Sequence, residues 1–219
     1  MSPAERLHSE FIPARVSSSR RLMVMLHGLG DSIEGYRWLP EMLGLPWLNY
    51  LLANAPDEYY GGFSWYDFIG DLTPGVERSR ALLTALLDEQ RKAGFPSEQT
   101  ILGGFSQGCL MSLETGLRYP YRLAAIIGIS GYLCDPKKLI EELSPLAREQ
   151  RVLVTHGTQD PMIPIAKVRE QIRILQKGGV ALEWHEFVKA HAIAGEQELS
   201  LIRRFVEKAY NAPAAPAGP

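Results

Sequence analysis

The chain has 219 residues, and 23 lysines and arginines stand against 25 aspartates and glutamates, which gives a formal net charge of −2. Nucleic-acid binding depends on a basic face, so this balance argues against a nucleic-acid partner. Hydrophobic residues make up 46% of the chain and charged residues 22%, which excludes disorder for most of its length. The two cysteines, Cys109 and Cys134, exclude a disulfide framework and a cysteine-rich zinc site.

The ends and the longest apolar runs of the chain set further expectations. Every apolar run is shorter than the ~20 residues that a membrane-spanning helix needs, so we expect no stable membrane insertion. Residues 1–20 are mixed and polar and lack the apolar core of a secretion signal, which predicts a cytoplasmic protein. Residues 1–210 show no linker or repeat and predict a single domain, whereas 211–219 (NAPAAPAGP) predict a disordered tail rich in proline and alanine.

Short apolar runs alternate with longer amphipathic runs along the chain. Buried strands are predicted where a run is apolar nearly throughout, at residues 22–27, 50–55, 100–104, 123–130 and 151–156, and an edge strand where apolar and polar residues alternate, at 180–187. Helices are predicted from the spacing of apolar residues at 76–93, 107–118, 136–149, 166–177 and 196–209. This order predicts an α/β fold with a mainly parallel central sheet and helices on both faces.

Two segments of the chain are candidates for a functional site. Residues 57–75 fit neither period, and we expect a long irregular segment that covers a site. Gly104-Phe105-Ser106-Gln107-Gly108 matches the pattern G-x-S-x-G between a predicted strand and a predicted helix, the setting in which such a serine is a nucleophile. The glycines suit this role because a residue without a Cβ lets strand and helix pass closely around a strained turn. The alternative is a glycine-rich turn with an incidental serine.

A serine hydroxyl needs a general base, and the base needs an orienting acid. His185 lies inside the last predicted strand and is interpreted as a solvated strand residue. His191 lies in the loop that leaves this strand, so we choose His191 as the base. Asp160 follows the end of the preceding strand and is the predicted acid, whereas Asp135, one strand earlier, is interpreted as a helix cap.

Acyl transfer also needs N–H donors for the oxygen that becomes negative. One predicted donor is the backbone N–H of Gln107, directly after the nucleophile. The other is the backbone N–H of Leu29, in the glycine-rich loop after the first predicted strand. His27 and Asp31, which flank this loop, and His156 are interpreted as structural residues.

Taken together, these residues resemble the phospholipase/carboxylesterase family of α/β-hydrolases, which includes acyl-protein thioesterases and bacterial carboxylesterases. The matching segments follow the family's order and are LHGLGDS at 26–32, SWYD at 64–67, GFSQG at 104–108, HGTQDPMIP at 156–164 and the loop of His191. The resemblance implies an α/β-hydrolase fold, a triad of Ser106, Asp160 and His191, and an oxyanion hole from the N–H groups of Leu29 and Gln107. It also implies no metal and no organic cofactor. The chain departs from the family's pattern at Ile33, Cys109 and Ala190.

The sequence therefore predicts a serine hydrolase that cleaves small-molecule carboxylic esters of short to medium acyl chains through an acyl-enzyme. The same machinery cleaves thioesters and lipid esters, so thioesterase or lysophospholipase activity is the alternative, and a catalytically silent ligand-binding protein is a second one. The sequence gives no indication of the oligomeric state. Large apolar groups on an irregular segment must pack on the body or line a pocket, and we expect an acyl site walled by Trp65, Phe68, Met162 and Ile163.

Overall fold

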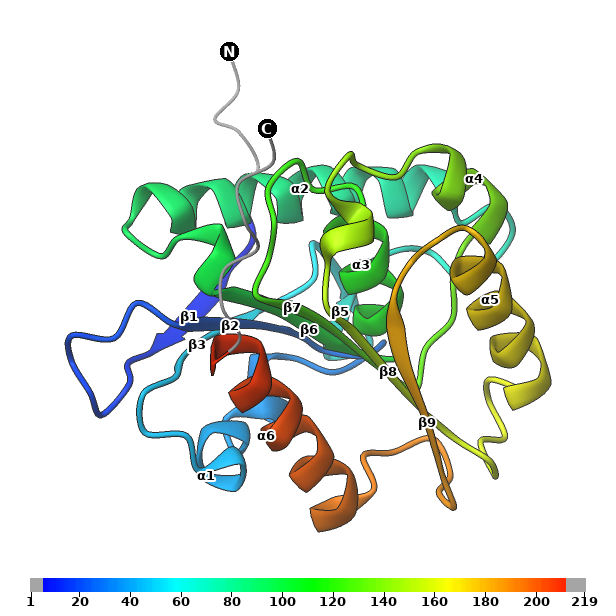
Figure 1. Cartoon of the computed structure of the whole chain (residues 1–219). Helices are drawn as coiled ribbons and strands as arrows, with labels where there is room; N and C mark the ends of the chain where they lie inside the picture. Colours follow the sequence, from blue (N-terminus) through cyan, green and yellow to red (C-terminus); the bar gives the residue numbers. More distant parts are fainter. Residues whose placement is uncertain (1–5, 212–219) are drawn as a thin grey trace.

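The computed structural model describes residues 6–211 and has at its centre a seven-stranded sheet of order β1-β3-β2-β6-β7-β8-β9 (Figure 1). Its six parallel strands are β2 (Leu22–Leu26), β3 (Asn49–Ala53), β6 (Thr100–Phe105), β7 (Ala125–Ile129), β8 (Val152–Gly157) and β9 (Leu182–Phe187). An antiparallel strand, β1 (Ser9–Ile12), pairs with β3 at one edge. Each parallel strand overlaps a strand predicted from the sequence, β9 from its alternating pattern and the others from apolar runs, so the mainly parallel α/β class is confirmed.

Helices cover both faces of the sheet (Figure 1). One face carries α2 (Thr73–Lys92), α3 (Gln107–Gly116), α4 (Pro136–Glu141) and α5 (Ile165–Lys177), and the other carries α1 (Leu39–Leu43) and α6 (Gly195–Asn211). Two buried apolar clusters lie between the sheet and these layers. In β2, Val24 belongs to one cluster and its neighbour Met25 to the other. Because both faces of the central strands are buried, β2, β3, β6, β7 and β8 read as nearly continuous apolar runs, whereas the edge strand β9 alternates.

Three local features differ from the sequence-based expectations. The helix predicted at 136–149 ends at Glu141, and only a 3₁₀ turn (Ala147–Glu149) follows, because Pro145 lacks an N–H and disfavours helical backbone at the residue before it. The expectation of an irregular segment from residue 57 is wrong at its start, which forms a hairpin of β4 (Asp57–Tyr59) and β5 (Gly62–Ser64). The short elements β1 and α1 are not predicted.

The predicted tail falls mostly outside the described part of the chain. Asn211, which the sequence assigns to the tail, is the last residue of α6. Residues 212–219 lie outside the described residues. Within residues 6–211, no helix combines the length and the apolar character that crossing a bilayer demands.

Candidate active site

The turn between β6 and α3 holds Ser106 in a backbone conformation that serine rarely adopts, with φ of 56° and ψ of −114°. The backbones around it approach so closely that side chains are excluded. A Cβ on Gly104 would lie 2.1 Å from the carbonyl oxygen of Gly108, and a Cβ on Gly108 would lie 2.3 Å from that of Leu26. Both glycines are therefore required for the crossing of strand and helix, as the motif predicts.

The three residues predicted as nucleophile, base and acid meet at the ends of β6, β8 and β9. His191 Nε2 lies 2.9 Å from Ser106 Oγ, and His191 Nδ1 lies 2.7 Å from Asp160 Oδ2. The carboxylate of Asp160 is fully buried, while Ser106 is half-buried. The fold thus joins residues from three separate loops into one hydrogen-bonded chain that ends at the protein surface.

Asp160 sits in a turn that stabilises its ionised form. Its Oδ1 accepts hydrogen bonds from the backbone N–H groups of Met162 and Ile163, both at 2.9 Å. Burial opposes ionisation, but the hydrogen bonds from His191, Ile163 and Met162 outweigh it, so the pKa of Asp160 is lowered from its ordinary value. An ionised carboxylate beside Nδ1 can stabilise a protonated imidazole.

His156 supports this turn from inside the protein. Its buried ring donates from Nε2 to the carbonyl oxygen of Ile163 at 2.9 Å, and Nε2 lies 3.6 Å from Asp160 Oδ2. Burial lowers the pKa of His156, which keeps the ring neutral near pH 7. The structural interpretation of this histidine is confirmed.

His185 and Asp135 also have the non-catalytic roles that the sequence suggests, as a solvent-exposed strand residue and as a helix cap. The side chain of His185 on β9 is 41% exposed. Asp135 precedes α4, and its carboxylate accepts from the N–H groups of Lys137 and Lys138 at 2.9 and 3.1 Å, which is helix capping.

The two predicted oxyanion donors belong to segments that adjoin Ser106. Gln107 is the first residue of α3, and the first-turn N–H groups of a helix have no acceptor within the helix. The loop of Leu29 lies against Ser106, because a Cβ on Gly28 would be 3.3 Å from the Cβ of Ser106. His27 shapes this loop: Nδ1 donates to the carbonyl of Gly28 at 2.6 Å, and Nε2 accepts from the N–H of Ala55 at 3.0 Å.

The hairpin β4–β5 hydrogen-bonds to the loop of Leu29. The sequence does not predict this contact. The N–H of Gly30 donates to the carbonyl of Phe63, and the N–H of Phe63 donates to the carbonyl of Asp31, both at 2.9 Å. The approach is close, since a Cβ on Gly62 would lie 2.2 Å from the carbonyl oxygen of Gly30. The hairpin is therefore part of the site's frame.

The side chain of Gln107 connects the nucleophile turn to the segment after the hairpin. Its Oε1 accepts from the N–H of Trp65 at 2.9 Å, and its Nε2 donates to the carbonyl of Tyr66 at 3.0 Å. The indole N–H of Trp65 in turn donates to the carbonyl of His27 at 3.0 Å. Nothing in the sequence pattern signals these contacts, because they depend on long-range packing.

The four residues expected to wall an acyl site lie at different depths. Met162 is 70% exposed and Phe68 is 46% exposed, and the Phe68 ring packs edge-on against Tyr59 at 6.0 Å between centroids. Ile163 is only 9% exposed and Trp65 is fully buried. Only Phe68 and Met162 therefore present substantial surface to a substrate.

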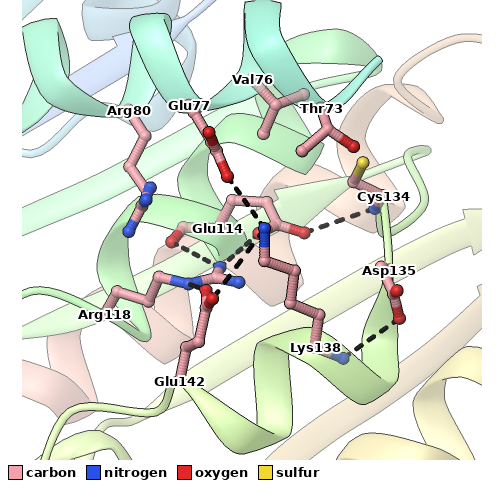
Figure 2. A pocket seen from close by; sticks show the side chains of 10 residues that line it. All are labelled: Thr73, Val76, Glu77, Arg80, Glu114, Arg118, Cys134, Asp135, Lys138 and Glu142. Atoms are coloured by element: carbon pink, nitrogen blue, oxygen red, sulfur yellow. Dashed lines mark hydrogen bonds and ion pairs between the residues drawn. The ribbon is translucent and has the colours of Figure 1, made fainter. Parts of the chain in front are cut away.

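A polar cleft between α2, α3 and α4 is a separate feature (Figure 2). The buried carboxylate of Glu114 pairs with Arg118, which also bonds Glu142 at 2.9 Å, and Lys138 bonds Glu77 at 2.8 Å. The ion pair of Lys138 and Glu77 links α4 to α2, and that of Arg118 and Glu142 links the chain after α3 to the end of α4. Within residues 6–211, no group of three or more histidine, cysteine or acidic side chains is arranged to hold a metal ion.

Comparisons with known proteins agree with this geometry. Residues 7–210 match the model of the family described as Phospholipase/Carboxylesterase. Acyl-protein thioesterase 1 of Schizosaccharomyces pombe is 35% identical over 176 residues, which cover 73% of this chain and 76% of the relative. Acyl-protein thioesterase 1 of Yarrowia lipolytica is 29% identical over 217 residues, which cover 90% of this chain and 95% of the relative.

A solved structure extends the likeness to the fold. The crystal structure of esterase PE8 is similar with a TM-score of 0.84 and 30% sequence identity, and the match covers 94% of this chain and 100% of that one. The α/β-hydrolase fold and the family resemblance of the motifs are thereby confirmed. Because the family model spans nearly all the described residues, the chain is an enzyme that belongs to the phospholipase/carboxylesterase family of serine hydrolases.

Proposed function

We propose that this enzyme hydrolyses carboxylic esters of short to medium acyl chains, with Ser106 as nucleophile, His191 as general base and Asp160 as orienting acid. The observation that carries the proposal is the hydrogen-bonded chain of 2.9 Å from Ser106 Oγ to His191 Nε2 and 2.7 Å from His191 Nδ1 to Asp160 Oδ2. This order lets the serine proton pass to the imidazole while the carboxylate stabilises the resulting cation.

The reaction follows from the placement of these groups. Ser106 Oγ attacks the ester carbonyl carbon, and His191 Nε2 takes its proton. The carbonyl oxygen becomes negative and accepts hydrogen bonds from the N–H groups of Leu29 and Gln107. Collapse of this intermediate expels the alcohol, which takes the proton from His191. Water, deprotonated by His191, then attacks the acyl-enzyme, releases the acid and restores the serine.

The acyl chain is assigned to the exposed apolar surface beside the triad. Met162 follows Asp160 by two residues, and its backbone N–H bonds the carboxylate of Asp160, so its exposed side chain lies at the same edge of the sheet. Phe68 belongs to the segment that follows the hairpin β4–β5. Trp65 and Ile163 are buried, so the proposal gives them no direct contact with the acyl chain.

Thioester hydrolysis is the second candidate, because the two curated relatives described above are both acyl-protein thioesterases. A thioester carbonyl accepts the same serine attack, and its thiolate is a better leaving group than an alkoxide. Assays on an ester and a thioester with the same acyl chain separate the two functions through the ratio of kcat/KM.

A fluorophosphonate probe tests the proposed nucleophile, because it reacts covalently with an activated serine. Ser106→Ala should abolish labelling and lower kcat by on the order of 10⁴ to 10⁶ without unfolding the protein. Ser200→Ala is the matched control, since this serine lies on α6 and its hydroxyl bonds Glu196. If Ser106→Ala keeps more than a tenth of the activity, Ser106 is not the nucleophile.

A further inference from the structure

Lys189 is buried two residues before His191, with 5% of its side chain exposed, although lysine is rarely buried unless it is paired. Its Nζ lies 2.6 and 2.8 Å from the two carboxylate oxygens of Glu198, which is fully buried on α6. This ion pair joins the loop of His191 to the last helix, and the proposed mechanism does not use it.

Glu198 makes another contact on the far side of His191. Its Oε2 accepts a hydrogen bond from the backbone N–H of Ala194 at 2.5 Å. One carboxylate thus holds the loop both before His191, through the ammonium group of Lys189, and after it, through the backbone of Ala194.

Lys189 also contacts the loop of the proposed acid. Its carbonyl oxygen accepts from the N–H of Gln159 at 3.1 Å, and a Cβ on Gly157 would lie 2.4 Å from the same oxygen. Burial lowers the pKa of Lys189, while the nearby carboxylates of Glu198 and Asp160 favour its charged form. Lys189 is therefore the point where the loops of Asp160 and His191 meet.

Stability alone does not account for a buried ion pair at this place. Replacing such a pair by well-packed hydrophobic residues of similar volume is often neutral or stabilising, because taking two charges out of water is costly. The placement on both sides of His191 points instead to geometry. Misplacing a reacting group by about 1 Å costs roughly 10²-fold in rate, so a loop that drifts by this much impairs proton transfer.

We infer that Lys189 and Glu198 are positioning residues that hold the imidazole of His191 in line between Asp160 and Ser106. The inference rests on the proposed function, since it assumes that His191 is the base. The pair acts through the loop and does not touch the reacting atoms.

The double variant Lys189→Met/Glu198→Gln tests the inference, because it removes both charges and leaves neither one buried alone. Active sites are counted with the fluorophosphonate probe, and kcat per active site and KM are measured with a short-chain ester. We expect kcat per site to fall by about 10- to 100-fold with KM within about twofold. We also expect the downfield proton resonance of the hydrogen bond between His191 and Asp160 to broaden or disappear.

Glu198→Asp is the second variant, in case the neutral pair does not fold. It keeps both charges but withdraws the carboxylate by one methylene, and it should lower kcat per site in the same way. The matched control is Lys208→Met/Glu183→Gln, an exposed Lys–Glu pair that joins α6 to β9, with Nζ 3.2 Å from Oε1. The control should keep the kcat of the parent enzyme.

The inference is overturned if the variants lose only thermal stability while kcat per site and the His191 resonance match those of the parent. Failure of the proposed function gives a different result, because the Ser106→Ala variant would then keep the activity of the parent enzyme.

Discussion

The side-chain amide of Gln107 hydrogen-bonds the backbone on both sides of the peptide that joins Trp65 to Tyr66, accepting at 2.9 Å and donating at 3.0 Å. The same residue supplies the backbone N–H that we assign to the oxyanion hole. Its side chain and its backbone therefore couple the segment after the hairpin to the site of reaction.

Gln107→Ala should lower both stability and activity. The variant leaves the buried N–H of Trp65 without the acceptor that Gln107 supplies, at about 1–3 kcal/mol in the free energy of unfolding, whereas the carbonyl of Tyr66 keeps the Ser64 hydroxyl as a donor at 2.8 Å. Urea unfolding measures this loss. Gln171→Ala is the matched control, because Gln171 makes the same two bonds to the backbone of Leu133, both at 2.9 Å. Equal effects of the two variants on kcat would contradict a special role for Gln107.

Asp160→Asn should lower kcat by on the order of 10⁴ while the protein stays folded, since an amide beside Nδ1 favours the wrong tautomer of His191. Asp135→Asn is the control, because asparagine caps a helix about as well as aspartate, and it should leave kcat unchanged. Steady-state kinetics on one ester suffices. Greater damage from the Asp135 change would show that the acid is assigned wrongly.

Unfolding should become easier as the pH falls below about 6.5. Burial lowers the pKa values of His27 and His156, so the unfolded chain takes up protons on these rings before the folded chain does. Their contribution is complete above the ordinary histidine pKa and is lost as the pH falls toward the folded values, with a limiting slope of about 1.4 kcal/mol per pH unit for each ring.

Urea unfolding from pH 7.5 down to 5 measures this slope. His156→Gln keeps an N–H donor for the carbonyl of Ile163 but does not titrate. The variant should therefore lower the slope of the unfolding free energy against pH by the amount that corresponds to about one proton. Stability that rises as the pH falls, or a slope unchanged in the variant, is incompatible with buried neutral rings.

Met162→Ala should change which acyl chain is cleaved best. Each buried methylene contributes roughly 0.8 kcal/mol, or about fourfold in binding, so kcat/KM should rise with chain length until the surface is filled. A series of nitrophenyl esters from acetate to laurate locates the optimum. Trp65→Ala is the contrast, because a fully buried tryptophan costs about 3–5 kcal/mol of stability when truncated, without a shift in the optimum. If Met162→Ala scales all chain lengths equally, Met162 does not contact the acyl chain.

The parts of the site that could be predicted are those that depend on the local pattern of apolar residues and glycines. The turn of Ser106 is bounded by a strand and a helix whose apolar spacing is clear, and its glycines are required by close backbone contacts. The loop of His191 follows β9 directly. Chain order and strand ends were therefore enough to bring Ser106, Asp160 and His191 to one edge of the sheet.

The parts that could not be predicted depend on contacts between distant segments or on rare backbone conformations. The turn of the hairpin β4–β5 places Tyr60 at φ of 45°, a conformation that its residue type does not signal. The partner of Lys189 lies on the next helix, and a lysine in a loop gives no sign of burial. Strand β1 is short and half-exposed, so its apolar signal is weak.

The order of strands in the sheet has a consequence for synthesis of the chain. All five residues of β2 are buried, and the strand pairs with β3 on one side and with β6 on the other. A growing chain that ends within α2 therefore has β2 and β3 but lacks β6, so it presents an apolar strand with an open edge, which invites aggregation. Completion of β6 closes this edge, and each later strand is added beside its predecessor. Fragments that stop before Thr100 should aggregate, and the nascent protein is most in need of a chaperone during that interval.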